Sequence, residues 1–246
     1  MKGWFYEILK LIKGYLKVNL GLHQKLKKKM ELERIAKIII YIHAGFGGIA
    51  LLTGGIALMV KKGGKVHKKS GKVFFISMLS SAVFALLISM LPKHESAFLF
   101  SIGIFSIYFL VSGYRSLNFK RGEIDIRLDR IIAYIIGITG LAMICYPIFI
   151  LGKLNVILLI FGCVGLVFGI QDLRAYRDLK QLKKSWLKAH LGKMTGGYIA
   201  AVSAFFVVNN ILPGVWNWFV PGIVGGGYIT YWMMKLNKTK TELVTQ

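Results

Sequence analysis

Seven runs of mostly apolar residues, each about as long as a bilayer is thick, constrain this chain more than any other feature. A helix needs roughly 20 such residues to cross the hydrocarbon core of a membrane. We therefore expect an all-α integral membrane bundle of about seven transmembrane helices. The expected spans are 35–60, 73–91, 97–114, 131–151, 156–170 (extending to about 173), 194–212 and 216–234.

The composition excludes a water-soluble globular protein. Hydrophobic residues make up 55% of the 246 residues and charged residues only 17%, whereas a soluble domain usually carries about a quarter charged residues. The formal net charge is +23. In a soluble chain that charge would indicate nucleic acid, but in a membrane chain it indicates basic loops that face anionic lipid. We expect membrane lipids with anionic headgroups as partners, and no nucleic acid.

The basic residues predict the orientation of the bundle. The loops at 61–72, 115–130 and 174–193, together with the C-terminal tail, hold 21 Lys and Arg residues, and the alternate loops hold only Lys93 and Lys153. Basic loops face the cytoplasm. The prediction is a multi-pass protein of the cytoplasmic (plasma or inner) membrane with a cytoplasmic C-terminus, and seven spans then place the N-terminus outside.

The N-terminal segment does not follow this rule, because residues 1–37 carry ten Lys and Arg residues. Glu7, Lys10, Lys13 and Lys17 recur on one face of a helix and apolar residues fill most of the rest, which is typical of an amphipathic helix lying in the membrane interface. We expect such an interfacial helix on the outer surface. Two other readings are a span over 3–22, which its charges oppose, and a re-entrant hairpin at 35–60, which is too short for two crossings.

These patterns divide the chain into three parts: an amphipathic basic N-terminal segment at 1–34, the transmembrane domain at 35–234, and a basic cytoplasmic tail at 235–246. Met30 is a second possible start, because the chain from that residue also has the pattern of a membrane protein.

Histidines are the main candidates for chemistry. His43 lies in the outer half of the first span and His94 in a short external loop, whereas His67 and His190 each lie in a basic cytoplasmic loop just before a span. Two pairs at opposite faces would suit two bis-histidine haems, since imidazole is a good axial ligand for haem iron. The other reading is that the loop histidines are solvated and His43 makes a hydrogen bond between helices.

Other site types find little support in the sequence. No Asp or Glu lies at mid-membrane, and Asp172 lies near the cytoplasmic end of the fifth span, so a proton-driven transporter is disfavoured. Ser80, Ser81 and Tyr108 offer hydroxyls without a partner base at a suitable spacing, which disfavours an enzyme. The two cysteines, at 145 and 163, exclude a disulfide scaffold and a CxxC zinc site, but a single disulfide between them stays open.

Two stretches carry a resemblance to a known family. One runs from His43 through Gly55 to His67-Lys68-Lys69-Ser70-Gly71-Lys72, and the other is Trp186-Leu187-Lys188-Ala189-His190-Leu191-Gly192-Lys193-Met194. They resemble an uncharacterised bacterial family of multi-pass membrane proteins, defined by a domain of unknown function, with a His–Gly–basic pattern at the first helical hairpin. The resemblance covers most of the chain after residue 35 and implies no particular activity. A looser similarity is to transmembrane b-type cytochromes, which pair histidines within helices.

Two functions follow as expectations. The first is a haem-binding electron-transfer protein with haem b at His43, His67, His94 and His190. The second is a non-enzymatic carrier, channel or assembly partner whose basic loops bind anionic lipid, a solute or an acidic partner. Its contact residues would be Lys68, Lys69, Lys183, Lys184 and Lys188.

Overall fold

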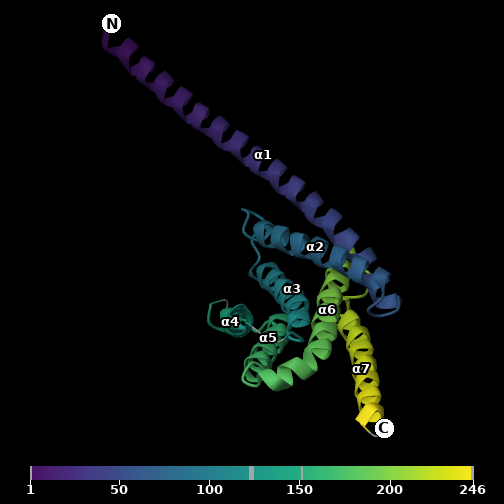
Figure 1. The fold of residues 1–246 in the computed structure, drawn as a ribbon. Helices are drawn as coiled ribbons and strands as arrows, with labels where there is room; N and C mark the ends of the chain where they lie inside the picture. The colour runs from purple at the N-terminus through teal and green to yellow at the C-terminus, as the bar shows by residue number, and fades with distance from the viewer. Residues whose placement is uncertain (1, 122–124, 151, 245–246) are drawn as a thin grey trace.

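The protein is all-helical throughout the residues that its computed structural model describes, which are 2–121, 125–150 and 152–244, with side chains described over 27–121, 125–150 and 152–238. The elements follow one another as hairpins (Figure 1). They are α1 (Lys2–Met59), α2 (Lys65–Ile88), α3 (Ala97–Arg115), the short 3-10 helix η1 (Ser116–Asn118), α4 (Arg127–Phe149), α5 (Val156–Ala175), α6 (Leu179–Asn209) and α7 (Trp216–Val244).

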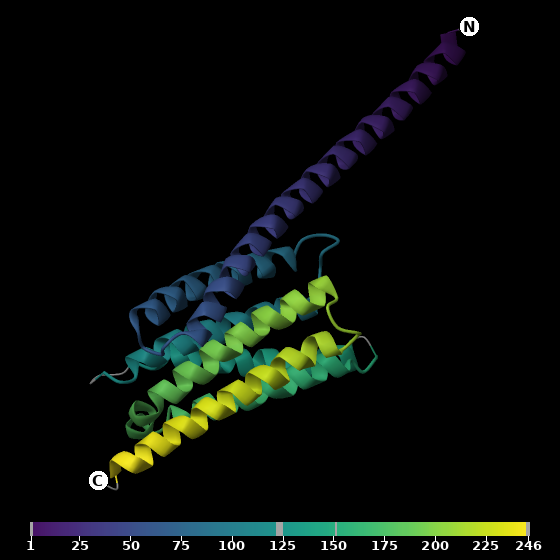
Figure 2. The same cartoon turned by 90° about the vertical axis from the view of Figure 1, so that its right-hand side faces the viewer.

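Helix α1 is one continuous helix of 58 residues. Its N-terminal part projects away from the bundle, and the two termini lie at opposite ends of the molecule (Figure 2). The backbone therefore continues as a helix through residue 34, where the expected interfacial segment meets the first expected span. The apolar face of that segment lies outside the residues whose side chains are described.

Six helices in the described part of the chain are long and apolar enough to cross a membrane. They coincide with the first six expected spans, and the chain has the architecture of a multi-pass membrane protein. Helix α7 is not among the six. Its apolar residues are interrupted by asparagine, tryptophan and tyrosine and by the run Gly225-Gly226-Gly227, so the seventh span stays a prediction.

Several helices begin earlier than the apolar runs. Helix α2 starts at Lys65 and α6 at Leu179, where basic loops were expected to run to 72 and 193. An Asp178 cap, whose carboxylate accepts from the backbone N–H of Gln181 at 3.0 Å, starts α6. Apolar length sets where a helix enters lipid, whereas capping sets where a helix begins. The prediction of loops around His67 and His190 was therefore wrong.

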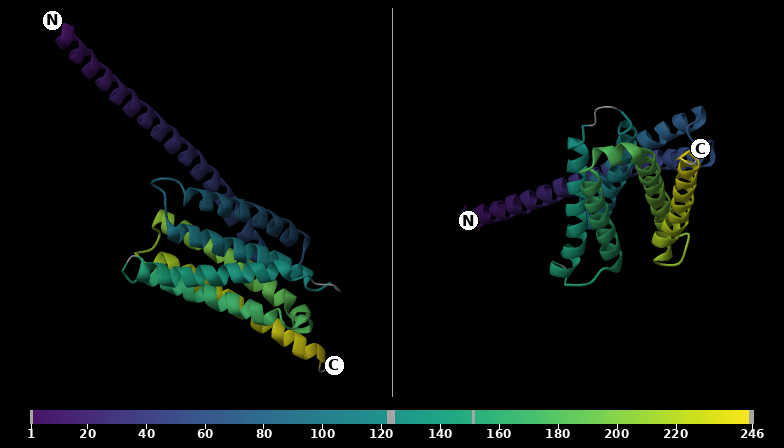
Figure 3. Two further views of the ribbon diagram at one scale, coloured as in Figure 1. Left: turned by 90° about the vertical axis from the view of Figure 1, so that its left-hand side faces the viewer. Right: turned by 60° about the horizontal axis from the view of Figure 1, so that its bottom comes forward.

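Helix α3 lies at the centre of the packing, because it contacts α2, α4 and α6. The remaining contacts are mainly between hairpin neighbours, α1 with α2, α4 with α5, and α6 with α7, which appear as adjacent pairs in Figure 3. One apolar core joins α1, α2, α3 and α6 around Phe74 and Leu110. A second joins α3, α4 and α5 around Phe105 and Ile136.

The α4–α5 pair packs through glycines. A β-carbon added to Gly140 would lie 2.6 Å from the carbonyl oxygen of Gly162, and one added to Gly162 would lie 2.7 Å from the carbonyl oxygen of Gly140. Small residues allow this approach of backbones in lipid.

The hairpin arrangement gives the bundle two ends. We call one the basic end: it holds the connections at 60–64, 116–126 and 176–178. The connections at 89–96, 150–155 and 210–215 make the opposite end.

Candidate functional site

His67 and His190 lie on helices at the basic end, and each imidazole holds the carbonyl end of a neighbouring helix. His67, in the first turn of α2, has its Nδ1 3.0 Å from the carbonyl oxygen of Ala57 near the end of α1. His190, on α6, has its Nδ1 2.8 Å from the carbonyl oxygen of Gly113 near the end of α3. Because a carbonyl only accepts, Nδ1 carries the proton in both rings and Nε2 keeps its lone pair.

Both histidines lie at the basic end of the bundle. His67 is one of the groups whose electric field acts on His190. In the described part of the chain, no hydrogen bond involves Nε2 of either ring. A histidine that binds a metal usually donates its other ring N–H to a backbone carbonyl or a carboxylate. The two-histidine site, His67 and His190, therefore has the tautomer and the anchoring that axial ligands need.

Lys62 and Tyr228 complete the end of α1 beside His67. The Lys62 ammonium donates to the carbonyl oxygen of Ala57 at 2.9 Å and also to that of Leu58. The Tyr228 hydroxyl donates to the Leu58 oxygen at 3.0 Å. A positive charge is favourable at the carbonyl end of a helix, and Lys62 supplies it there. His67 caps the same end of α1 through its hydrogen bond to the Ala57 oxygen.

The space next to Gly54 and Gly113, at the basic end, is already occupied by side chains of other helices. A β-carbon on Gly54 would lie 2.5 Å from the ring of Tyr198, and one on Gly113 would lie 3.0 Å from Met194. Imidazole nitrogens are suitable donors for haem iron, but these glycines pack helices together and do not form the seat of a macrocycle.

His43 makes reciprocal hydrogen bonds between α1 and α2. Its Nδ1 lies 2.9 Å from both the carbonyl oxygen and the hydroxyl of Ser81, and that hydroxyl lies 3.1 Å from the carbonyl oxygen of His43. Because the Ser81 carbonyl oxygen only accepts, Nδ1 of His43 carries the proton, so the imidazole is a donor to Ser81 and not a base for its hydroxyl. Ser81 is only 3% exposed, so this contact joins two helices and offers no access to a substrate.

His94 is not close to His43. Its Nε2 lies 3.9 Å from the Glu33 carboxylate, which also pairs with Lys93 at 2.6 Å. Glu33 and His43 are ten residues apart on α1, which is about 15 Å along the helix axis. One iron atom cannot be bound by two imidazoles at such different depths. Of the two expected pairs, His43 and His94 are therefore separated, whereas His67 and His190 lie at the same end of the bundle.

A half-buried ion pair joins α5 to α6. Asp172, on the last turn of α5, accepts from Lys193 of α6 at 2.5 Å and from the Tyr108 hydroxyl of α3 at 2.8 Å, both on Oδ2. Each of the two charged side chains is 14% exposed. We call these three residues the Asp172 cluster. Ionisable groups within a membrane protein are costly and mark functional sites.

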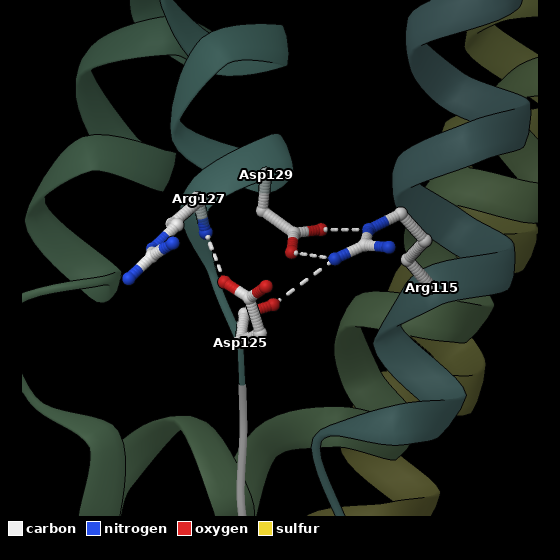
Figure 4. Close-up of polar contacts among 4 residues, drawn as sticks. All are labelled: Arg115, Asp125, Arg127 and Asp129. Carbon is white, nitrogen blue, oxygen red and sulfur yellow. Dashed lines mark hydrogen bonds and ion pairs between the residues drawn. The ribbon is translucent and has the colours of Figure 1, made fainter.

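A second ion pair joins α3 to α4 (Figure 4). The guanidinium of Arg115 donates to both oxygens of Asp129, at 2.9 Å and 2.7 Å, and to the carbonyl oxygen of Asp125 at 3.0 Å. Asp129 is completely buried. A bidentate contact of this kind fixes both position and orientation.

Tyr176 lies between the two ion pairs at the end of α5. Burial, and then the negative charges of Asp172 and Asp129, raise the pKa of its hydroxyl far above the ordinary range. The hydroxyl is therefore a neutral donor at physiological pH, and it is buried and faces the Asp172 carboxylate.

The expected lysine contacts differ in their surroundings. Lys68, Lys69 and Lys184 are exposed at the basic end. Lys188 donates to the Asn237 side chain at 2.5 Å, and Lys183 also interacts within the protein.

The cysteines at 145 and 163 are both unpaired thiols, so the disulfide left open by the sequence is not formed here.

Sequence reasoning missed Lys193 and Asp129. Lys193 was counted as a loop residue, and Asp129, which lies between Arg127 and Arg130, was within the expected basic loop. The signal that could have found them is an acidic residue at the edge of an apolar run, because such a residue needs a cationic partner once it is buried.

No protein-family model, curated protein or solved structure matches the chain.

Proposed function

We propose that the chain is an electron-transfer protein of the cytoplasmic membrane that binds haem b at the two-histidine site. Its basic end would face the cytoplasm, as the distribution of lysine and arginine favours. The observation that supports the proposal is that both imidazoles at the basic end have Nδ1 bound to a backbone carbonyl.

The roles of the two side chains follow from this anchoring. His67 is fixed to the end of α1 and His190 to the end of α3, so the two rings are held by different helices. Each would present Nε2 as an axial ligand, and apolar helices around the site would exclude water. Haem iron held by two imidazoles supplies one-electron transfer.

Substitution by asparagine separates the two roles of each histidine. In His67→Asn and His190→Asn the amide can still donate to the same carbonyl, but Nε2 is lost. We expect the purified wild-type protein, expressed with ample haem, to show a Soret band and sharp α and β bands after dithionite reduction. Each asparagine variant should lose these bands while keeping its helical circular dichroism.

His43→Asn and His94→Asn are the matched controls, because the structure places these rings away from the pair. They should keep the wild-type spectrum. A colourless wild-type protein, or bands that persist in both His67→Asn and His190→Asn, would contradict the haem proposal.

The exposed lysines favour a second function, binding of anionic lipid at the basic end. Asp129 and Asp172 are already paired with Arg115 and Lys193, so they do not balance the exposed cations. Each Lys near an anionic membrane surface contributes about 1 kcal/mol. In this case the protein is a non-enzymatic carrier, channel or assembly partner.

Charge reversal at Lys68, Lys69 and Lys184 tests the second function. We expect added phosphatidylglycerol to raise the thermal unfolding midpoint of the wild-type protein in detergent more than phosphatidylcholine does. The triple variant with Glu at these positions should lose that difference, and high salt should weaken it in the wild type. Lys153→Glu, exposed at the opposite end, is the control and should keep the difference. Equal responses of the triple variant and the wild type would exclude a specific role for these lysines.

A further inference from the structure

A cationic pocket lies at the end of the bundle opposite the basic end, where α1 leaves the other helices (Figure 2). Its volume is about 400 Å³. The lining residues are Lys29, Met30, Glu33, Arg34 and Lys37 of α1, together with Lys93 from the 89–96 connection. Four cations against one carboxylate give this pocket a formal charge of +3.

The one carboxylate that lines the cationic pocket is already paired. Glu33 accepts from the Lys93 ammonium at 2.6 Å, and this contact holds Lys93 beside α1 although its backbone is in the left-handed region, with φ at 70°. Lys29, Arg34 and Lys37 are exposed and form no ion pair with the described side chains. The pocket therefore keeps three cations for an anionic ligand.

The face of α1 that continues from the cationic pocket toward the membrane interior is open. Arg34, Lys37, Tyr41, Gly45 and Gly48 follow one another at spacings of three or four residues, so they lie on one side of the helix. Tyr41 is 76% exposed, and tyrosine rings prefer the membrane interface. A β-carbon added to Gly45 or Gly48 would meet no atom within 4 Å. The two glycines lie about 16–21 Å from Arg34 along the helix axis, at the depth of the hydrocarbon core.

We propose that the cationic pocket and this face of α1 together bind one anionic phospholipid, with its phosphate between Arg34 and Lys37 and an acyl chain along Gly45 and Gly48. A guanidinium matches phosphate oxygens as a bidentate donor, and an ammonium adds charge. A soluble anion would use the pocket alone, whereas cations followed by open apolar surface match a molecule with a charged head and an apolar tail. The site depends neither on haem nor on the lysines of the basic end, because it lies at the opposite end of the bundle.

Photolabelling of the purified full-length protein in detergent, with a phosphatidylglycerol that carries a photoreactive acyl chain, tests the proposal. We expect label on residues 38–52 of α1, and unlabelled phosphatidylglycerol should displace it better than phosphatidylcholine does. Arg34→Gln combined with Lys37→Gln should weaken binding, measured by this displacement, by about tenfold to thirtyfold, because each cation near an anionic membrane surface accounts for roughly a fivefold change in affinity. Both side chains are exposed, so the variant should keep its helical circular dichroism.

Lys153→Gln is the matched control, because Lys153 is exposed at the same end of the bundle but does not line the cationic pocket. It should keep the wild-type labelling of 38–52. The triple glutamate variant of the basic end should also keep it, which separates this site from lipid binding at the other end.

Gly45→Leu combined with Gly48→Leu tests the acyl chain separately from the phosphate. The open surface accommodates both side chains, and leucine has the higher helix propensity, so the helix should persist. The leucines would fill the path of the acyl chain, and labelling should fall although the charge of the pocket is unchanged. The proposal would be overturned by a wild-type protein without label on 38–52, by wild-type labelling in either double variant, or by glycerol phosphate displacing the probe as well as phosphatidylglycerol does, since the ligand would then be a free anion.

Discussion

Replacing Asp129 by alanine is expected to lower the free energy of unfolding by about 3–5 kcal/mol, the typical cost of removing one partner from a buried ion pair. The carboxylate is completely buried and receives two hydrogen bonds from Arg115. Without it, the guanidinium of Arg115, whose side chain is 26% exposed, keeps only the Asp125 carbonyl oxygen as an acceptor in the described protein. The measurement is denaturant unfolding in detergent, followed by tryptophan fluorescence.

Two further variants isolate the charge. Asp129→Leu combined with Arg115→Met removes both charges, and its stability should return to within a few kcal/mol of the wild type, because well-packed apolar pairs often replace buried ion pairs without loss. Asp125→Asn alters an exposed side chain at the same junction and should have little effect. If Asp129→Ala were no less stable than Asp125→Asn, the buried pair would not hold α3 to α4.

Gly140→Ala is expected to destabilise the protein, whereas Gly137→Ala should be neutral or stabilising. A β-carbon at Gly140 would meet the carbonyl oxygen of Gly162 at 2.6 Å and the backbone nitrogen of Leu166 at 2.8 Å. Backbone atoms cannot turn away as a side chain can, so α4 and α5 must separate, at a cost of about 1–3 kcal/mol. At Gly137 no atom lies within 4 Å of the added carbon, and alanine has the higher helix propensity.

The two variants share one helix and differ by one turn, so they control for each other. Thermal unfolding in the same detergent should give midpoints on opposite sides of the wild type, or a wild-type midpoint for Gly137→Ala. Equal effects of the two substitutions would contradict the close packing of α4 on α5.

Hydropathy predicted the helical class and the places where six helices cross, because both depend on runs of apolar residues. It could not predict where helices begin outside lipid: α6 begins at Leu179, and the histidine expected in a loop lies eleven residues into that helix. The glycines were recognised as packing residues, but only the fold shows that a β-carbon added to Gly140 would meet Gly162, whereas one added to Gly137 would have no atom within 4 Å.

The ion pairs show a second limit of prediction from the sequence. Lys193 and Asp172 are 21 residues apart and Arg115 and Asp129 are 14 apart, and no local periodicity joins residues at such separations. Which cation pairs with which carboxylate depends on how hairpins dock, and that is decided by packing over the whole bundle. The same limit applied to the histidines, where depth alone suggested that His43 pairs with His94 and the packing of the helices separates them.

The continuity of α1 has a mechanical consequence. At 1.5 Å per residue its 58 residues measure about 87 Å, nearly three times the thickness of a hydrocarbon core. Proline is absent from the helix, and its last carbonyls hold Lys62 and His67. A force that tilts the projecting N-terminal part of α1 is therefore transmitted along one continuous helix to the opposite end of the bundle. A small rotation of α1 there displaces the His67 imidazole, which is bound to the Ala57 oxygen.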